Sequence, residues 1–397
     1  MNRRMALALL TVLPAWLIIE LCFWPHPQGA SEMLARLGAG PYTAASAYCR
    51  TRYGWFALAC GAQLALWLAL ASPPVSRALE TAVARLSPVR RAAAIALACT
   101  ALARSLSLTF GFASGHLLDR AYGLTRQSTW AWLSEQLLEH ALAGCVTIAA
   151  AAAVIWAAGR FGRRWWLVST AVLSAGTLAL VTAQPLLIDP LFDRYVPLKG
   201  TPGSERLIEL ARRAGFDPAR LSVALVSHRT TKGNAFVNGL GPTERIALWD
   251  TFLEASRADE AELVLAHELG HWRAGHVALG TALALVGLAA AMMLFSALFP
   301  VPTPRDVPAI LLTVFILRVA CLPVENAVSR AIEAQADFLS LRYTNKAEAF
   351  IRAEEQLARQ NLSDPDPPPL AVWLLFTHPP TSERIAMARS YARAGSR

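Results

Sequence analysis

The residues with the clearest chemical potential lie in residues 262–272, which contain the pattern His-Glu-x-x-His. Side chains four residues apart share one face of an α-helix, so His267 and His271 can bind one metal ion together. Glu268 directly follows the first histidine and can take a proton from a metal-bound water. This arrangement is typical of zinc metalloproteases. The alternative is a surface helix that carries two histidines by chance.

A catalytic zinc site usually has a third protein ligand, which must come from elsewhere in the chain. His276 comes one residue too early to complete the longer pattern His-Glu-x-x-His-x-x-Gly-x-x-His. Glu333 is the candidate, and it shares a helix face with Asp337, which could orient a ligand histidine through its other ring nitrogen. Spacing alone leaves Glu325 and Glu262 open as alternative third ligands. Glu333 and Asp337 could also be an ordinary exposed acidic pair without function.

The composition indicates a membrane protein with a soluble part. Of 397 residues, 55% are apolar and 16% are charged, whereas soluble domains are usually about 45–50% apolar. The net charge is +9, but no basic run is interleaved with aromatic residues, so membrane lipids and not nucleic acid are the expected partners. The six cysteines show no Cys-x-x-Cys spacing, which argues against disulfides and thiolate metal sites.

Seven apolar segments are interpreted as transmembrane helices, which predicts a mainly α-helical, multi-pass membrane protein. We expect five of them, with interfacial loops, in residues 1–184 and two in residues 277–328. The segments are approximately residues 5–24, 55–72, 92–115, 141–158, 165–183, 277–299 and 308–321. No small-x-small cleavage site follows the first segment, so it is interpreted as a retained helix and not as a signal peptide.

The soluble part is predicted to consist of residues 185–276 and residues 329–397. Residues 204–214 have helical periodicity, whereas residues 221–226 and 245–250 alternate as strands do. The helix with the histidine motif follows, which gives a zincin-like α+β metalloprotease segment. The C-terminal part is predicted to be helical, to supply the third zinc ligand and to complete the site.

A set of motifs resembles the CAAX prenyl protease 1 family of integral-membrane zinc metalloproteases. The His-Glu-x-x-His motif alone fits many families, whereas the whole set is specific and covers most of the chain in order. The set comprises residues 122–128, 189–193 with 197–198, 233–236, 245–251, 266–272 with 275–276, 329–337, and 378–380 with 384–385. The resemblance implies seven long helices that enclose a large water-filled chamber, with the zinc site at its mouth.

The resemblance also implies a role for each matching residue in the zinc site. One Zn²⁺ per chain would be bound by His267, His271 and Glu333. Glu268 would be the general base that takes a proton from the zinc-bound water and passes it to the leaving amine. The predicted function is therefore that of an integral-membrane zinc metalloendopeptidase.

Four further residues receive roles around the zinc and along the substrate. Asp337 and Arg384 would support the ligands, and His378 would stabilise the oxyanion. Asn234 and residues 245–250 would hold the substrate backbone as an added β-strand at an exposed sheet edge. Without the resemblance, His378 would be interpreted as a helix-start histidine and Arg384 as a surface arginine.

The expected substrate is a peptide or protein that is membrane-associated or lipidated. Prenylated CAAX peptides define the family, but the arginine- and alanine-rich composition favours a bacterial origin, and bacteria largely lack such substrates. A different membrane protein or a misfolded protein is then the expected target.

Two other functions are possible from the sequence: a non-catalytic zinc-containing transporter or scaffold, and a site-2-type intramembrane protease. Glu268 argues against the first alternative, because a structural zinc site needs no base; the motif's position before a span argues against the second.

The expected location is the cell membrane, which is the inner membrane in a bacterium. With seven spans, the loops near residues 73–92, 159–164 and 300–307 share one side and carry most short-loop arginines. The positive-inside rule assigns that side to the cytoplasm, so the metal domain would face outward. The resemblance implies the opposite orientation, and we favour the cytoplasmic side for the active site.

Overall fold

The computed structural model describes residues 30–395, so the first predicted span, residues 5–24, lies outside the described residues. Five segments of the described chain are long and apolar enough to cross a membrane. They are Ala39–Leu70, Pro88–Ala121, Thr129–Leu191, His276–Leu298 and Pro304–Thr344. These segments confirm the predicted mainly α-helical, multi-pass architecture, and the count of seven spans is approximate.

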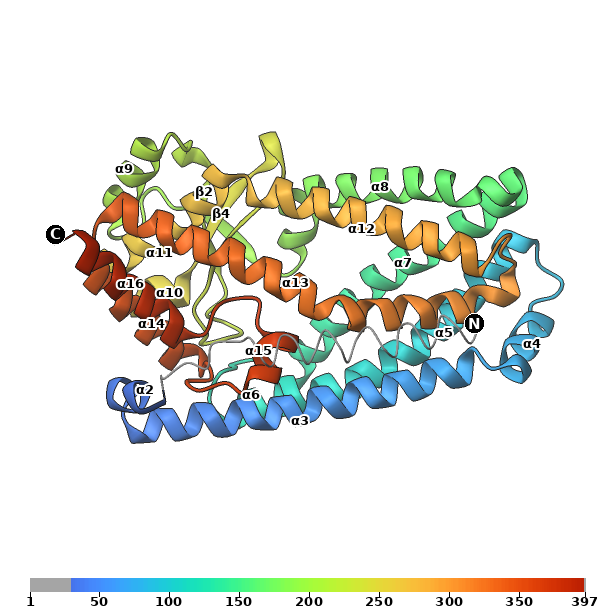
Figure 1. The fold of residues 1–397 in the computed structure, drawn as a ribbon, viewed down its shortest axis with the longest axis horizontal. Coiled ribbons are helices and arrows are strands. Elements are labelled where there is room, and N and C mark those ends of the chain that lie inside the picture. Colours follow the sequence, from blue (N-terminus) through green and yellow to red (C-terminus); the bar gives the residue numbers. More distant parts are fainter. Residues whose placement is uncertain (1–29, 396–397) are drawn as a thin grey trace.

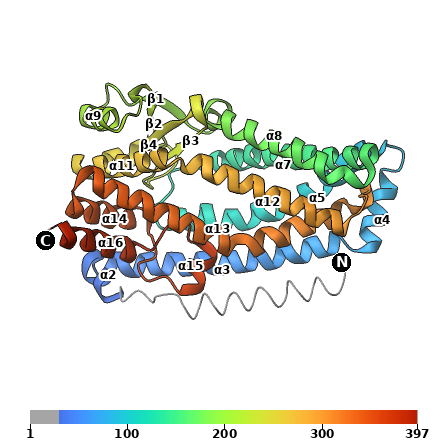
Figure 2. The same cartoon turned by 45° about the horizontal axis from the view of Figure 1, so that its top comes forward.

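The long helices lie side by side and end in the soluble domain at one end of the molecule (Figures 1 and 2). Helix α5 packs against α7, α7 against α8, α8 against α12, and α13 against α3 and α5. A turn at Gly162, with φ 53°, separates α7 from α8 inside the third apolar segment. These helices are α3 (Ala39–Leu70), α5 (Pro88–Gly111), α7 (Thr129–Phe161), α8 (Trp165–Ala183), α12 (His276–Leu298) and α13 (Val307–Thr344).

Helix α13 connects the membrane part to the soluble part without a break. It begins at Val307, passes through Pro323, and continues to Thr344. The last predicted span and the candidate ligand Glu333 therefore belong to one rigid element. The predicted boundary between residues 328 and 329 falls inside this helix.

The soluble domain contains a four-stranded sheet with the order β1-β2-β4-β3. Strand β2 (Leu221–Leu225) pairs antiparallel with β1 (Arg194–Pro197) and parallel with β4 (Arg245–Trp249), and β3 (Ala235–Asn238) pairs antiparallel with β4. The two strands predicted from alternation are present. However, β4 is paired on both sides, so the prediction that residues 245–250 offer an exposed edge to the substrate is wrong. The edges of the sheet are β1 and β3.

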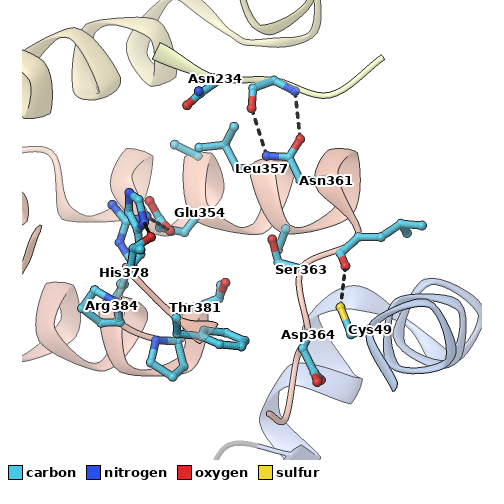
Figure 3. Close-up of a pocket in the computed structure, with 18 of the residues that line it drawn as sticks. Cys49, Asn234, Glu354, Leu357, Asn361, Ser363, Asp364, His378, Thr381 and Arg384 are labelled. Carbon is cyan, nitrogen blue, oxygen red and sulfur yellow. Dashed lines mark hydrogen bonds and ion pairs between the residues drawn. The ribbon is translucent and has the colours of Figure 1, made fainter. Parts of the chain in front are cut away.

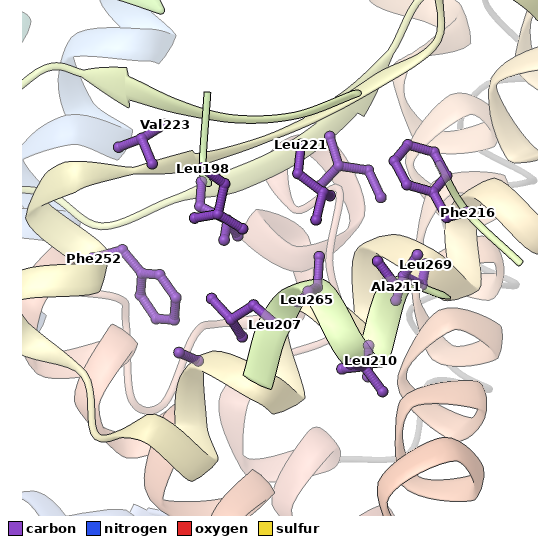
Figure 4. Close-up of a cluster of buried hydrophobic side chains, with 14 residues drawn as sticks. Leu198, Leu207, Leu210, Ala211, Phe216, Leu221, Val223, Phe252, Leu265 and Leu269 are labelled. Carbon is purple, nitrogen blue, oxygen red and sulfur yellow. The ribbon is translucent and has the colours of Figure 1, made fainter. Parts of the chain in front are cut away.

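The apolar side of the sheet packs against α9 (Ser204–Ala214) and α11 (Ala258–Ala274) (Figure 4). Leu265 and Leu269 of α11 are fully buried in this cluster. Burying a leucine contributes about 1.5–3 kcal/mol, so this contact fixes how α11 is rotated. Residues two apart on a helix point in nearly opposite directions, and His267 and His271 therefore face away from the sheet toward α13.

Shorter helices close the domain around α11 and α13. A second apolar cluster joins α2, α14 and α16 to α11 through Leu263 and to α13 through Leu341. Helix α11 comes close to α13 at Gly270, where an added Cβ atom would lie 3.2 Å from the carbonyl oxygen of Ala336. The remaining helices are α2 (Ala30–Leu37), α4 (Pro73–Ala82), α6 (Leu118–Ala121), α10 (Asp250–Ala255), α14 (Ala347–Asn361), α15 (Pro369–Leu375) and α16 (Thr381–Gly395).

Candidate metal centre and active site

Three side chains from α11 and α13 converge between these helices. The Nε2 atoms of His267 and His271 are 3.0 Å apart. Glu333 Oε2 lies 3.1 Å from the Nε2 atom of His267 and 3.4 Å from that of His271. The absence of a Cβ atom at Gly270 permits the close helix approach that brings Glu333 to the histidines.

The geometry and chemistry of these three groups fit a divalent metal ion. Tetrahedral zinc has bonds of about 2.0–2.2 Å to nitrogen and oxygen, which separates neighbouring ligand atoms by about 3.3–3.6 Å. The observed separations of 3.0, 3.1 and 3.4 Å are close to that spacing, with the first two slightly shorter. Two imidazoles and one carboxylate are also a common ligand set of catalytic zinc sites.

The two alternative third ligands lie elsewhere. Glu262 forms an ion pair with Lys346, and Glu325 is an exposed residue of α13. Glu325 precedes Glu333 by about two helical turns, which separates them by about 12 Å along the axis at 1.5 Å per residue. Among the described residues, His267, His271 and Glu333 are the group found close enough to hold one metal ion.

The ring nitrogens that face away from this centre also have close polar neighbours. His267 Nδ1 lies 2.8 Å from Asp337 Oδ1, and His271 Nδ1 lies 2.9 Å from His276 Nδ1. Such partners fix the orientation and tautomer of a metal-binding histidine. The sequence identified Asp337 as one such partner but assigned no role to His276.

Arg384 lies between two buried carboxylates. Its Nε atom donates to Asp337 Oδ2 at 2.8 Å, and its Nη1 atom lies 2.7 Å from Glu354 Oε2. Burial would lower the pKa of Arg384, but Asp337 and Glu354 raise it, so the guanidinium stays charged. Arg384 is therefore not the surface arginine that its sequence position alone would suggest.

Glu354 is a site residue that the sequence analysis missed. It is 5% exposed, and burial raises the pKa of its carboxyl to about 7 against the opposing effect of Arg384. The only signal in the sequence is its position on α14, where Phe350 and Ala358 lie one turn away on either side and are both buried. A glutamate in an apolar helical stripe must have a polar partner, but the sequence does not name that partner.

A cavity of about 550 Å³ opens onto this network (Figure 3). Its wall includes His267, Glu268, Glu354, His378 and Arg384. Glu268 is 6% exposed, and burial raises the pKa of its carboxyl. Within the described chain this carboxylate has no hydrogen bond or ion pair and is left accessible from the cavity.

His378 also lines the cavity and lies close to the convergent ligands. Its Nε2 atom is 3.3 Å from Glu333 Oε2. Desolvation lowers the pKa of His378 and so favours its neutral ring, although 55% of the side chain is exposed to the cavity and solvent. Thr377 Oγ1 lies 2.9 Å from His378 Nδ1 and can donate to it. The remaining ring proton is then on Nε2, which acts as a donor toward the centre.

Asn234 lies on the wall of the cavity opposite His378, next to the start of β3 (Figure 3). Its carbonyl oxygen accepts a hydrogen bond from the backbone N–H of Trp249 at 3.0 Å. The preceding Gly233 pairs through both its N–H and its C=O with the side-chain amide of Asn361, at 2.8 and 2.9 Å. Asn234 thus directly precedes the edge strand β3 and is exposed, whereas Gly233 before it is buried and bonded to Asn361 of α14.

Comparison with known proteins identifies the family. The family model described as Peptidase family M48 matches residues 204–392, and the model described as CAAX prenyl protease N-terminal, five membrane helices, matches residues 42–194. The uncharacterized metalloprotease YhfN of Bacillus subtilis (strain 168) is 30% identical over 294 residues, which are 70% of this chain and 69% of YhfN. The chain belongs to peptidase family M48.

Other proteins similar to this M48 protein agree with the resemblance found in its sequence. The CAAX prenyl protease 1 homolog of Arabidopsis thaliana is 27% identical over 295 residues, covering 70% of this chain and 68% of the plant protein. The crystal structure of S. mikatae Ste24p superimposes with a TM-score of 0.69 at 22% identity, covering 76% of this chain and 77% of Ste24p. The predicted family, fold class and enzyme class are confirmed: this is a multi-pass membrane metalloprotease that acts on peptides or proteins.

Proposed function

We propose that this M48 protein is a zinc metalloendopeptidase whose metal ion is held by His267, His271 and Glu333. The observation that carries the proposal is the convergence of these three ligand atoms within 3.0–3.4 Å of one another, beside a cavity. One zinc ion per chain fits this ligand set. When bound, the ion would act as a Lewis acid toward the scissile carbonyl and would acidify a water molecule.

Glu268 is proposed as the general base. It follows a proposed ligand directly in the chain, lines the cavity, and has a carboxylate that is free within the described residues. It would take a proton from the attacking water and later deliver that proton to the leaving amine. A carboxylate already held by an arginine, such as Glu354, is less suited to this transfer.

His378 is proposed to stabilise the negative charge that develops on the carbonyl oxygen. Its neutral ring, with Nδ1 close to the Thr377 hydroxyl, directs an N–H group toward the ligand cluster. A donor that is held in place before the reaction stabilises the transition state more than it stabilises the substrate.

The substrate is proposed to bind as an extended peptide along the Asn234 end of β3. The support is that β3 is an edge strand and that Asn234 lines the same cavity as Glu268. An edge strand can pair with an added peptide strand through main-chain hydrogen bonds. Phe56, Phe350 and Phe376 line this cavity as well, which suits an apolar or lipidated segment of a membrane-associated substrate.

The active site is proposed to open on the cytoplasmic side, as the resemblance to CAAX prenyl proteases implies. The distribution of arginines instead favours an active site that opens on the opposite side of the membrane. Helix α4 and the α7–α8 turn lie at the end of the helices remote from the metal centre (Figure 1). This end carries the exposed residues Arg77, Arg85, Arg163 and Arg164, which the positive-inside rule would assign to the cytoplasm.

Metal analysis and a cleavage assay on the purified full-length protein test this function. We expect about one zinc ion per chain and cleavage of unstructured peptides that stops when zinc is chelated. Protein without bound metal would contradict the proposal, and bound zinc without any cleavage would favour a non-catalytic zinc protein. The site-2-type alternative is disfavoured because α11, which carries the histidines, is not among the apolar spans.

A further inference from the structure

His276 touches the proposed metal centre without being one of its ligands. Its Nδ1 atom lies 2.9 Å from His271 Nδ1, and its Nε2 atom lies 3.1 Å from Gln335 Oε1. His276 is 6% exposed, whereas Gln335 is on the exposed face of α13. A chain of three side chains therefore runs from a proposed ligand to an amide at the protein surface.

The turn at Gly275 makes this contact. On a continuous helix, residues five apart would point about 140° away from each other, given 3.6 residues per turn. Instead, α11 ends at Ala274, Gly275 adopts the left-handed conformation with φ 66°, and α12 begins at His276. The two imidazole rings then lie 4.9 Å apart between centroids, with their planes at 75°. This break explains why the spacing of the motif does not reveal the role of His276.

We propose that His276 and Gln335 are positioning residues that fix His271 in its metal-binding tautomer. A neutral imidazole has one N–H donor and one nitrogen lone pair. If His271 binds metal through Nε2, its proton must be on Nδ1, from which it donates to His276 Nδ1. His276 then carries its own proton on Nε2 and donates it to the amide oxygen of Gln335.

The orientation of the Gln335 amide determines the direction of these hydrogen bonds. If the NH₂ group of Gln335 faced His276, it would donate to His276 Nε2, and His276 would donate from Nδ1 to His271. The proton of His271 would then be on Nε2, where no lone pair is left for a metal ion. An acceptor at position 335 therefore favours metal binding, and a group that cannot accept does not.

Zinc affinity measured on three variants of the full-length protein in detergent tests this inference, which rests on the proposed ligation by His271. Gln335→Met keeps the chain length without an acceptor, Gln335→Glu provides an acceptor only, and His276→Leu removes the imidazole. Competition with a chromophoric chelator gives the zinc Kd of each apo-protein. We expect Gln335→Met and His276→Leu to raise the Kd by up to about 10–100-fold, and Gln335→Glu to retain or improve the wild-type Kd.

The matched control is Thr281→Val, a change at a buried residue of α12 whose hydroxyl donates to the carbonyl of Val277 within the helix. It should leave the zinc Kd unchanged. The inference is overturned if Gln335→Glu weakens zinc binding as much as Gln335→Met does. It is also overturned if His276→Leu, with an unchanged melting temperature, keeps the wild-type Kd. Wild-type protein that binds no zinc would instead overturn the proposed metal site itself.

Discussion

The carboxylate of Asp337 lies 2.8 Å from Nδ1 of His267, and Asp337 is completely buried. The same carboxylate accepts a hydrogen bond from Arg384 at 2.8 Å. A carboxylate behind a metal-binding histidine fixes the ring and increases its basicity. Because Arg384 also contacts Glu354, the orientation of His267 depends on helices α13, α14 and α16 together.

Replacing Asp337 with asparagine should weaken zinc binding. The change keeps the shape of the side chain but removes the charge beside His267, so we expect the zinc Kd to rise about 10–100-fold. Chelator competition on the purified variant measures this. Glu325→Gln is the matched control, since Glu325 is an exposed carboxylate on the same helix. An unchanged Kd in Asp337→Asn would show that Asp337 does not support the ligand.

Replacing Arg384 with methionine should destabilise the folded protein. The substitution leaves Asp337 and Glu354 buried without their cation, which typically costs about 3–5 kcal/mol. Denaturant unfolding in detergent gives the change in the free energy of unfolding. Arg389→Met is the control, because the ion pair of Arg389 with Glu32 is about 40% exposed and should contribute less than about 1 kcal/mol. Equal effects of the two changes would contradict the buried network.

The pairs of site residues that lie four apart on one helix could be predicted from the sequence. His267, His271 and the acidic pair Glu333 and Asp337 are each four residues apart, and helix geometry alone places each pair on one face. Spacing could not choose Glu333 over Glu325, because that choice depends on how α11 and α13 pack. The decisive feature is the close approach at Gly270, which is a tertiary contact.

The other differences between the predictions from the sequence and the observed structure also arise from tertiary contacts. Alternation predicted residues 245–250 as a strand, but pairing partners come from distant segments, and they make β4 a central strand. His276 could not be placed because the turn at Gly275 changes the direction of the chain. Glu354 joins the site through its ion pair with Arg384, and nothing local in the sequence connects these two residues.

Replacing His378 with alanine should slow catalysis while zinc remains bound. Loss of one preorganised donor to an oxyanion typically lowers kcat about 10²–10³-fold. His378→Gln, which keeps an N–H donor, should retain part of the activity. Steady-state kinetics and metal analysis on the same samples separate the two effects. If His378→Ala lost zinc instead of kcat, the residue would be a ligand and not an oxyanion donor.

The side of the membrane on which the site opens can be read from reporters fused after Arg397. The cytoplasmic assignment predicts a fluorescent green fluorescent protein fusion and an inactive alkaline phosphatase fusion. The arginines at the remote end of the helices predict the reverse, through the positive-inside rule. Alkaline phosphatase activity at this position would contradict the cytoplasmic assignment without affecting the proposed chemistry.

The most direct test of the central claim compares the wild-type protein with Glu268→Gln, purified in parallel in detergent. Glutamine keeps the shape of the side chain but cannot take a proton, and Glu268 is not one of the three convergent ligands. The account predicts about one zinc ion per chain in both proteins and peptide cleavage in the wild type only. Cleavage by Glu268→Gln at the wild-type rate would contradict the account, because it would show that another group is the base.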